Sequence, residues 1–299
     1  MIIVTGCNGF IGSNLVVKLN ELGIKDIIGV DDLSKKENLN NIAHCEMENL
    51  LDIEEFENKY LDSTKSFSEI TQIFHQGACS NTMEWDGEYM MKNNYDYSKS
   101  LLHFSIEKHI PFIYASSAAV YGCDTQFDDN PCVQQIPLNV YGYSKWLFDQ
   151  YVLKRLPTVQ SPVVGLRYFN VYGPHQLTEG EYCTVIGIFE RQKNNGEVLT
   201  ITGDGQQRRD FTHVKDIVDG LIKCGLDLIN EDNSKANGEI FELGRGINYS
   251  INEVANMFGG EKTYIDEKKG EVRDTLCIDS KAKELLNWNP KRNLEDYIN

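Results

Sequence analysis

The chain has 299 residues, of which 41% are hydrophobic and 25% are charged, so it can bury a large core in one domain or in two unequal ones. Its net charge of −16 argues against nucleic acid and anionic membrane surfaces as partners, because both would repel it. The sequence contains neither an apolar run near the roughly 18 residues of a membrane span nor the basic segment of a signal peptide, and we expect a cytoplasmic protein.

The first segment predicts a strand, a glycine turn and a helix. An apolar run at 2–4 is typical of a buried parallel strand, and apolar residues at helical spacing begin at Ile11 and stop before Gly23. The turn between them has the spacing G-x-x-G-x-x-G, with Gly6, Gly9 and Gly12. Such glycines permit a tight turn, a close approach to a pyrophosphate and close helix packing, while the helix N-terminus attracts the phosphates. The segment predicts dinucleotide binding; a glycine turn of some other α/β fold is the alternative.

A second apolar run ends at Asp31, where an acid is expected to meet the adenosine ribose. Further apolar runs at 71–78, 111–118 and 162–170 alternate with helical stretches near 88–108 and 141–155. This alternation predicts a Rossmann-type, doubly wound parallel sheet in an α/β protein. Ligands of such sheets bind beyond the carboxyl ends of the strands. The residues expected at that edge are Gly77, Ser116, Ser117 and Asn170.

Tyr141 lies four residues before Lys145, so the two side chains share one face of a helix. A phenol with a pKa near 10 needs about 4 kcal/mol of stabilisation of its anion to titrate near pH 7, and an ammonium roughly 4 Å away supplies about that much. We therefore expect Lys145 to lower the pKa of Tyr141 and to hold the ribose, while Ser117 binds the reacting oxygen. The phenol would take a hydroxyl proton as hydride leaves the same carbon. The alternative is a packing tyrosine beside a solvated lysine.

The eight cysteines contain no CxxC pair, which disfavours disulfides and a metal site and fits reduced thiols. We expect no bound metal.

Four ordered motifs, TGCNGFIG, SSAAVYG, YGYSK and RYFNVYGP, resemble the extended short-chain dehydrogenase/reductase superfamily in its nucleotide-sugar epimerase and dehydratase branch. Residues 77–99 and 137–152 are similar to ADP-glycero-manno-heptose 6-epimerases, whereas 179–220 and 268–290 are more similar to UDP-hexose 4-epimerases. In both families the cofactor oxidises a carbinol, the keto-sugar presents its other face, and hydride returns. The dehydratases carry an Asp–Glu pair after the serine, where this chain has two alanines, so dehydration is not expected.

The resemblance implies an NAD-dependent nucleotide-sugar epimerase, most like the heptose 6-epimerases. The alternatives are a UDP-hexose 4-epimerase and, in a different class, a non-catalytic dinucleotide-binding sensor. The expected partner is a nucleoside-diphosphate sugar, and we expect a homo-oligomer, as in relatives.

The resemblance also assigns roles to residues. The expected catalytic residues are Ser117, Tyr141, Lys145 and Glu179, the last standing where the heptose enzymes are thought to place a second base, a lysine. The expected cofactor contacts are Gly6, Asn8, Gly9, Phe10, Ile11, Gly12, Asp31, Asp32, Asp52, Ile53, Gln76, Gly77, Ala78, Asn94, Tyr141 and Lys145. The expected substrate contacts are Ser80, Ser117, Asn170, Arg209 and Arg273.

Two of these roles have a structural alternative. Guanidinium groups suit bidentate contact with phosphate, but Arg209 and Arg273 could instead serve surface solubility or form an Asp–Arg pair that holds the domain. Asp52 could accept from the adenine amino group, or it could cap the following helix.

The cofactor is expected to be NAD. Heptose epimerases that prefer NADP have lysines where this chain has Asn38 and Ile53. Asp31 and Asp32 would repel a 2′-phosphate, while Lys35 and Lys36 are near enough to compensate, so NADP is the alternative. We expect an NAD-binding domain at 1–170, with a return of the chain near 211–246, and a smaller, mainly substrate-binding α/β domain at 171–299.

Overall fold

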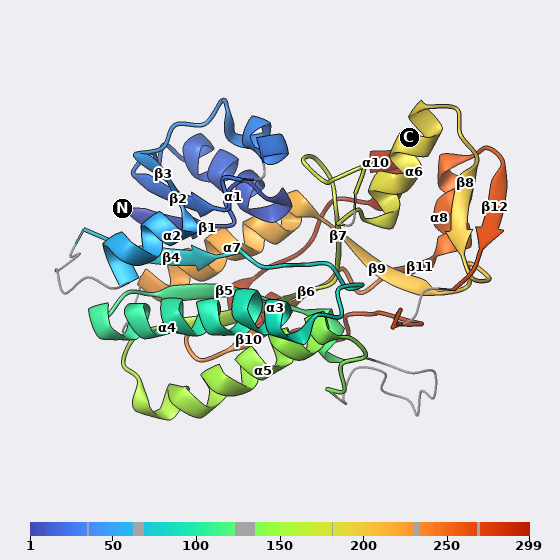
Figure 1. The fold of residues 1–299 in the computed structure, drawn as a ribbon. Coiled ribbons are helices and arrows are strands. Elements are labelled where there is room, and N and C mark those ends of the chain that lie inside the picture. The colour runs from blue at the N-terminus through green and yellow to red at the C-terminus, as the bar shows by residue number, and fades with distance from the viewer. Residues whose placement is uncertain (35, 62–68, 123–134, 181, 230–233, 268–269) are drawn as a thin grey trace.

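The computed structural model describes residues 1–34, 36–61, 69–122, 135–180, 182–229, 234–267 and 270–299 (Figure 1). Lys35, named above as a possible partner of a 2′-phosphate, lies outside these ranges.

A sheet of seven parallel strands forms the larger lobe, in the order β10-β6-β5-β4-β1-β2-β3. Its strands are β1 (Ile2–Thr5), β2 (Ile27–Asp31), β3 (Asn49–Asp52), β4 (Gln72–His75), β5 (Phe112–Ser117), β6 (Val163–Tyr168) and β10 (Ile240–Leu243). The order reverses between β1 and β4, the place where such sheets bind ligands. The predicted Rossmann-type fold is confirmed.

Helices cover both faces of this sheet. The helices of the larger lobe are α1 (Phe10–Glu21), α2 (Ile53–Phe56), α3 (Gly87–Met91), α4 (Tyr97–Lys108), α5 (Val140–Arg155), α7 (Val214–Ile229) and α9 (Lys281–Leu286). Short 3₁₀ or π segments are η1 (Lys36–Ile42), η2 (Glu57–Leu61), η3 (Lys92–Asp96), η4 (Ala118–Val120) and η5 (Leu156–Thr158). In Figure 1, α4 and α5 run together along one face, and α1 and α7 lie on the other. The helix predicted at 88–108 is α3, η3 and α4 in continuous succession.

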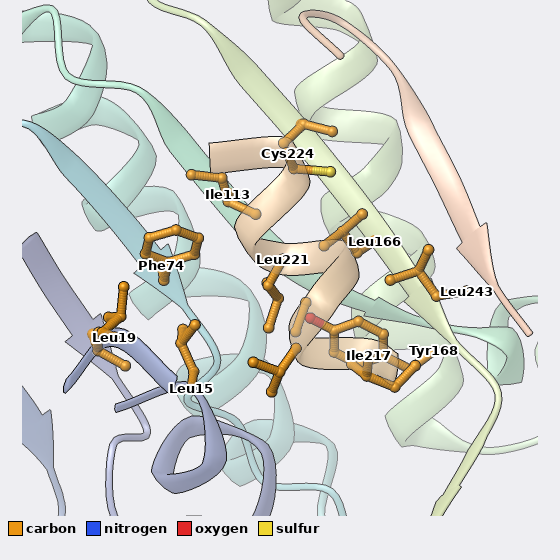
Figure 2. Close-up of a cluster of buried hydrophobic side chains, with 14 of the residues drawn as sticks. Leu15, Leu19, Phe74, Ile113, Leu166, Tyr168, Ile217, Leu221, Cys224 and Leu243 are labelled. Carbon is orange, nitrogen blue, oxygen red and sulfur yellow. The ribbon is translucent and has the colours of Figure 1, made fainter. Parts of the chain in front are cut away.

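The core between the sheet and the α1–α7 face explains why these helices dock (Figure 2). The α7 sequence repeats apolar residues at helical spacing, and Ile217, Leu221 and Cys224 are buried along one stripe. They pack with Leu15 and Leu19 of α1 and with side chains of four adjacent strands: Phe74, Ile113, Leu166 and Leu243. Each such side chain contributes about 1.5–3 kcal/mol on full burial, which fixes α1, and with it the glycine turn, against the sheet.

The smaller lobe has its own core. Its strands are β7 (Asn170–Tyr172), β9 (Arg208–His213) and β11 (Asn248–Ser250) in one sheet, with β8 (Leu199–Thr202) and β12 (Lys262–Ile265) in a parallel pair. Its helices are α6 (Val185–Asn194), α8 (Ile251–Phe258) and α10 (Leu294–Ile298). The core residues include Tyr172, Ile186, Phe189, Ile201, Phe211 and Val254.

The chain passes between the lobes more than once. After β9 in the smaller lobe, α7 packs on α1 and β10 becomes the edge of the large sheet beside β6. Near the C-terminus, Ala282 and Leu286 of α9 and the following Trp288 again join the core of the larger lobe. On the basis of the two separate cores, we propose two domains whose boundary the chain crosses repeatedly.

Within the described residues, no helix combines the length and apolar character that crossing a membrane requires.

Candidate functional site

The glycine turn between β1 and α1 is built from close backbone contacts. Gly6 has a φ of +67°, and a Cβ atom on it would lie 2.6 Å from the Gly77 nitrogen. A Cβ atom on Gly12 would lie only 2.0 Å from the Gly6 carbonyl oxygen. The Gly9 N–H donates to the same oxygen at 3.1 Å. Side chains at 6 and 12 are therefore excluded, and the N-terminus of α1 lies directly over the end of β1.

Two buried donors beside this turn are not paired within the described protein. Asn8, 2% exposed, and Gln76 each have a side-chain nitrogen without a hydrogen-bond partner. The Tyr168 hydroxyl donates to the side-chain oxygen Oε1 of Gln76 at 2.8 Å and so fixes the orientation of that side-chain amide. An unpaired buried donor costs about 1–3 kcal/mol, and a ligand rich in acceptors would satisfy both. The turn and these donors fit a dinucleotide.

Asp31, the last residue of β2, is held by backbone donors. Its carboxylate accepts from the N–H of Asn8 at 2.7 Å and from that of Asp32 at 2.8 Å. The Asp32 carboxylate accepts from the N–H of Ser34 at 3.1 Å. Asp31 thus ties the glycine turn to the end of β2, the place where a ribose was predicted. Phe10 and Ile11, also predicted cofactor contacts, are half-buried in the first turn of α1.

Asp52 has the capping role that the sequence left open. One oxygen accepts from the N–H of Glu54 at 3.1 Å at the start of α2, and the other accepts from the N–H of Leu33 at 3.1 Å. Its neighbour Ile53 is half-buried as the first residue of α2. The capping interaction is confirmed, and contact with adenine stays a prediction.

A buried asparagine side chain links the loop after β4 to α5 by hydrogen bonds. Asn94 is fully buried; its side chain accepts from the Cys79 N–H at 2.8 Å and donates to the Cys79 carbonyl at 2.9 Å and to Ser144 at 3.0 Å. It therefore positions the loop, and its predicted contact with the cofactor stays a prediction. Gly77 donates its N–H to the Thr5 hydroxyl at 3.2 Å. Ala78, on this loop, is exposed.

The structure brings the three central catalytic candidates together. Ser117 ends β5 and its hydroxyl is hydrogen-bonded to that of Tyr141, near the start of α5. The Asn139 side chain caps this helix by accepting from the Gly142 N–H at 2.8 Å. One turn further, the Lys145 ammonium is 4% exposed and donates to the Ala115 carbonyl of β5 at 2.8 Å. A phenol, an alcohol and a cation thus share the edge of the sheet that also carries the glycine turn.

The electrostatics of this group differ from expectation. Burial raises the pKa of Tyr141, and the hydrogen bond from Ser117 only partly opposes it. Burial lowers the pKa of Lys145 to about 8, while the charge of Asp149 acts in the opposite direction. The prediction that Lys145 lowers the pKa of Tyr141 is therefore wrong for the protein by itself. The physical reason is that loss of hydration outweighs the attraction of an ammonium that is turned towards Ala115.

The two arginines predicted to bind phosphate both form ion pairs within the smaller lobe. Arg209, 7% exposed, binds Glu271 at 3.0 Å. Arg273 makes two contacts with Asp204, at 2.8 and 2.9 Å. Both arginines thus have acidic partners in the protein by itself, and binding of substrate phosphates stays a prediction.

The other predicted substrate and catalytic positions are Asn170, Ser80 and Glu179. Asn170 opens β7 and its side-chain oxygen accepts from the Thr275 hydroxyl at 3.2 Å, so it faces the segment that carries Arg273. Ser80 and Glu179 are exposed. The structure describes no contact that joins Glu179 to Tyr141, and its role as a base stays a prediction.

Sequence analysis missed a buried polar group behind the catalytic candidates. Asp149 is fully buried on α5 and binds Arg167 of β6 at 2.8 Å. The available signal was the spacing of four residues from Lys145, which places both on one helix face.

Two of the eight cysteines, Cys123 and Cys132, lie outside the described residues, and the structure bears on the expectations about cysteines and metals only within the residues that it describes. There, no three His, Cys, Asp or Glu side chains gather as they would around a metal ion. The described cysteines that are free are Cys7, Cys45, Cys79, Cys183, Cys224 and Cys277.

Comparison with known proteins places this geometry in a family. Residues 2–244 match the NAD dependent epimerase/dehydratase family. The chain is 41% identical over 295 residues to an ADP-L-glycero-D-manno-heptose-6-epimerase of Alkalilimnicola ehrlichii, covering 93% of this chain and 92% of that protein.

Two solved structures extend the comparison over 99% of the chain and 96% of each structure. The UDP-glucose 4-epimerase of Thermotoga maritima, with UDP-glucose, is 29% identical with a TM-score of 0.86. The UDP-glucuronic acid 4-epimerase of Bacillus cereus, in complex with UDP-glucuronic acid and NAD, is 26% identical with a TM-score of 0.82. The resemblance drawn from the four motifs is confirmed, and the chain belongs to the NAD dependent epimerase/dehydratase family.

Proposed function

We propose that this enzyme is an NAD-dependent nucleotide-sugar epimerase whose substrate is an ADP-glycero-manno-heptose, inverted at the exocyclic C6. The observation that carries the reaction class is the hydrogen-bonded pair of Ser117 and Tyr141, with Lys145 one turn away, at the sheet edge that also bears the glycine turn. The choice of heptose rests on the 41% identity over nearly the whole length of both proteins.

The protein's own groups account for binding and proton transfer. Gly6, Gly9 and Gly12 form the tight turn beside which the pyrophosphate would bind, and Asn8 and Gln76 supply buried donors. NAD bound there would supply reversible hydride transfer to and from the carbinol carbon and the positive charge of its nicotinamide ring.

Around the substrate, Ser117 holds the reacting oxygen and Tyr141 takes its proton and later returns it. Lys145, fixed by Ala115, keeps a positive charge beside the phenol and is placed to hold the ribose. Because redox change is only transient, the bound dinucleotide is not consumed.

NAD rather than NADP is the proposed cofactor. The Asp31 carboxylate stands at the end of β2, bound by the N–H groups of Asn8 and Asp32, and a 2′-phosphate there would meet negative charge. The NAD in the Bacillus cereus complex supports the same choice.

A UDP-hexose 4-epimerase is the second candidate, favoured by the TM-score of 0.86 to the Thermotoga maritima enzyme. On this alternative Arg209 would leave Glu271 for the UDP phosphates.

Product analysis separates the candidates. The protein, loaded with NAD, is incubated separately with ADP-glycero-manno-heptose, UDP-glucose and UDP-N-acetylglucosamine, and the epimers are resolved by chromatography. We expect conversion of the heptose without steady growth of NADH absorbance. Conversion of a UDP-hexose alone would replace the heptose assignment by the 4-epimerase. Accumulation of NADH would indicate a dehydrogenase, and no turnover of any sugar would indicate a sensor.

A further inference from the structure

Asp149 joins the catalytic helix to two strands of the central sheet. Its carboxylate accepts from the Tyr114 hydroxyl at 3.1 Å and from the Ser116 hydroxyl at 2.9 Å, both on β5. It also binds Arg167 of β6 through two guanidinium nitrogens, at 2.9 and 2.8 Å. Because Ser117 directly follows Ser116, these contacts set how the end of β5 lies against α5.

The pair extends into a second buried carboxylate. Arg167 donates at 2.6 Å to the Tyr121 hydroxyl, which in turn donates to Glu242 of β10. Asp149, Arg167 and Glu242 are each no more than 8% exposed. If both acids are ionised, they carry two negative charges against one guanidinium, and Lys145 supplies the second positive charge in this part of the interior.

Each element around Lys145 contributes a different group. From β4 comes His75, whose pKa is lowered to about 3 by burial and by Lys145 itself, so it is neutral. The thiol of Cys79 follows β4, and on β5 the Ala115 carbonyl accepts from the ammonium. On α5 itself, Tyr141 precedes the lysine by one turn.

Asp149 follows Lys145 by one turn on the same helix. Among the described residues, it is the carboxylate whose charge raises the pKa of Lys145 against the effect of burial. Arg167 of β6 forms an ion pair with Asp149 and partly compensates its negative charge. Since the pKa of Lys145 is only about 8, a small loss of electrostatic stabilisation of its ammonium would deprotonate it at neutral to mildly alkaline pH.

We propose that Asp149 is a positioning residue that keeps Lys145 positively charged and holds the Ser117 end of β5 against the catalytic helix. The inference deepens the proposed epimerase chemistry and depends on it for its consequence, since an uncharged lysine would neither favour the phenolate nor hold the ribose as strongly. The charge effect itself is independent of any substrate.

The test measures Lys145 directly. The ε-carbon of Lys145 is followed by NMR against pH in the full-length, ¹³C-lysine-labelled protein, and its signal is assigned by its loss in Lys145→Arg. In the native protein we expect a midpoint near pH 8. In Asp149→Asn, which keeps the shape but removes the charge, we expect the midpoint to fall by about one pH unit or more. Tyr114→Phe, which removes one hydrogen bond to Asp149 and no charge, should leave the midpoint in place.

A midpoint in Asp149→Asn equal to that of the native protein would overturn the proposal. If Asp149→Asn does not fold, Asp149→Asn combined with Arg167→Met removes the whole ion pair. The midpoint should then still fall, but by less, because the positive charge of Arg167 is lost as well. Where turnover is measured, the alkaline limb of the pH–rate profile of Asp149→Asn should shift to lower pH by as much as the midpoint of Lys145 does. Activity should then fall about fivefold or more at pH 8.5 and much less at pH 6.5. A loss equal at all pH values would instead mean a purely structural role. Failure of all sugars to react, with the NMR shift present, would count against the epimerase function and not against the charge effect.

Discussion

Gly12→Ala tests the glycine turn. A Cβ atom at this position would lie 2.0 Å from the Gly6 oxygen, 2.7 Å from the Gly6 carbonyl carbon and 3.1 Å from the Cys7 Cα. These are backbone atoms, so no side chain can rotate away, and α1 must move by about 1 Å or more relative to the turn. Alanine would favour the helix by about 1 kcal/mol, but overpacking of this kind costs about 1–3 kcal/mol or more, so the clash dominates.

The displaced helix N-terminus is the proposed pyrophosphate site. A loss of 1.4–2.8 kcal/mol in binding corresponds to about a 10- to 100-fold weaker affinity for NAD. Calorimetric titration with NAD and thermal unfolding followed by circular dichroism measure the two effects. Gly87→Ala is the matched control, because Gly87 opens α3 and a Cβ there would have no neighbour within 4 Å. Wild-type affinity and stability in Gly12→Ala would refute the steric argument.

The remaining predictions concern pH and the arginines. The His75 pKa is lowered to about 3 from an ordinary value of 6.5, so between these pH values the unfolded state binds a proton that the folded state does not. The free energy of unfolding should therefore fall as pH falls from 6.5, by up to about 1.4 kcal/mol per pH unit. In His75→Gln this dependence on pH should be weaker, as measured by thermal unfolding between pH 7 and 4. An unchanged dependence would contradict the prediction. On the second candidate function, in which Arg209 binds the UDP phosphates, Arg209→Lys should raise the KM for the UDP-hexose about tenfold or more, because lysine lacks the bidentate geometry. Arg273→Lys, at an exposed ion pair, should change this KM less than about threefold. Equal effects in steady-state kinetics would refute the distinction.

The sequence predicted those features that depend on neighbours along the chain. The glycine spacing placed the turn, and the alternation of apolar strands and helices predicted the parallel sheet. The interval from Tyr141 to Lys145 on one helix put both side chains at the same edge as Ser117. In each case local spacing determines geometry, because a helix or a parallel strand repeats at a known period.

Features that depend on distant segments were not predictable in this way. The Asp149 site draws on α5, β5 and β6, and no short pattern joins these residues. The pairing of Arg209 with Glu271 likewise spans 62 positions. The direction of the Tyr141 pKa shift was wrong because it depends on burial, which a spacing argument does not measure. The hydrogen bonds of Asn94 to Cys79, 15 positions earlier, were likewise not predicted, and its contact with the cofactor stays a prediction.

The central claim is that the Tyr141 hydroxyl transfers the proton while NAD carries the hydride. Tyr141→Phe removes only this oxygen, and bound NAD and turnover are measured on the same sample with the sugar that the native protein converts. The account predicts that turnover falls by about 10²- to 10⁴-fold while the amount of bound NAD is unchanged. A variant that epimerises the sugar at the native rate would contradict it.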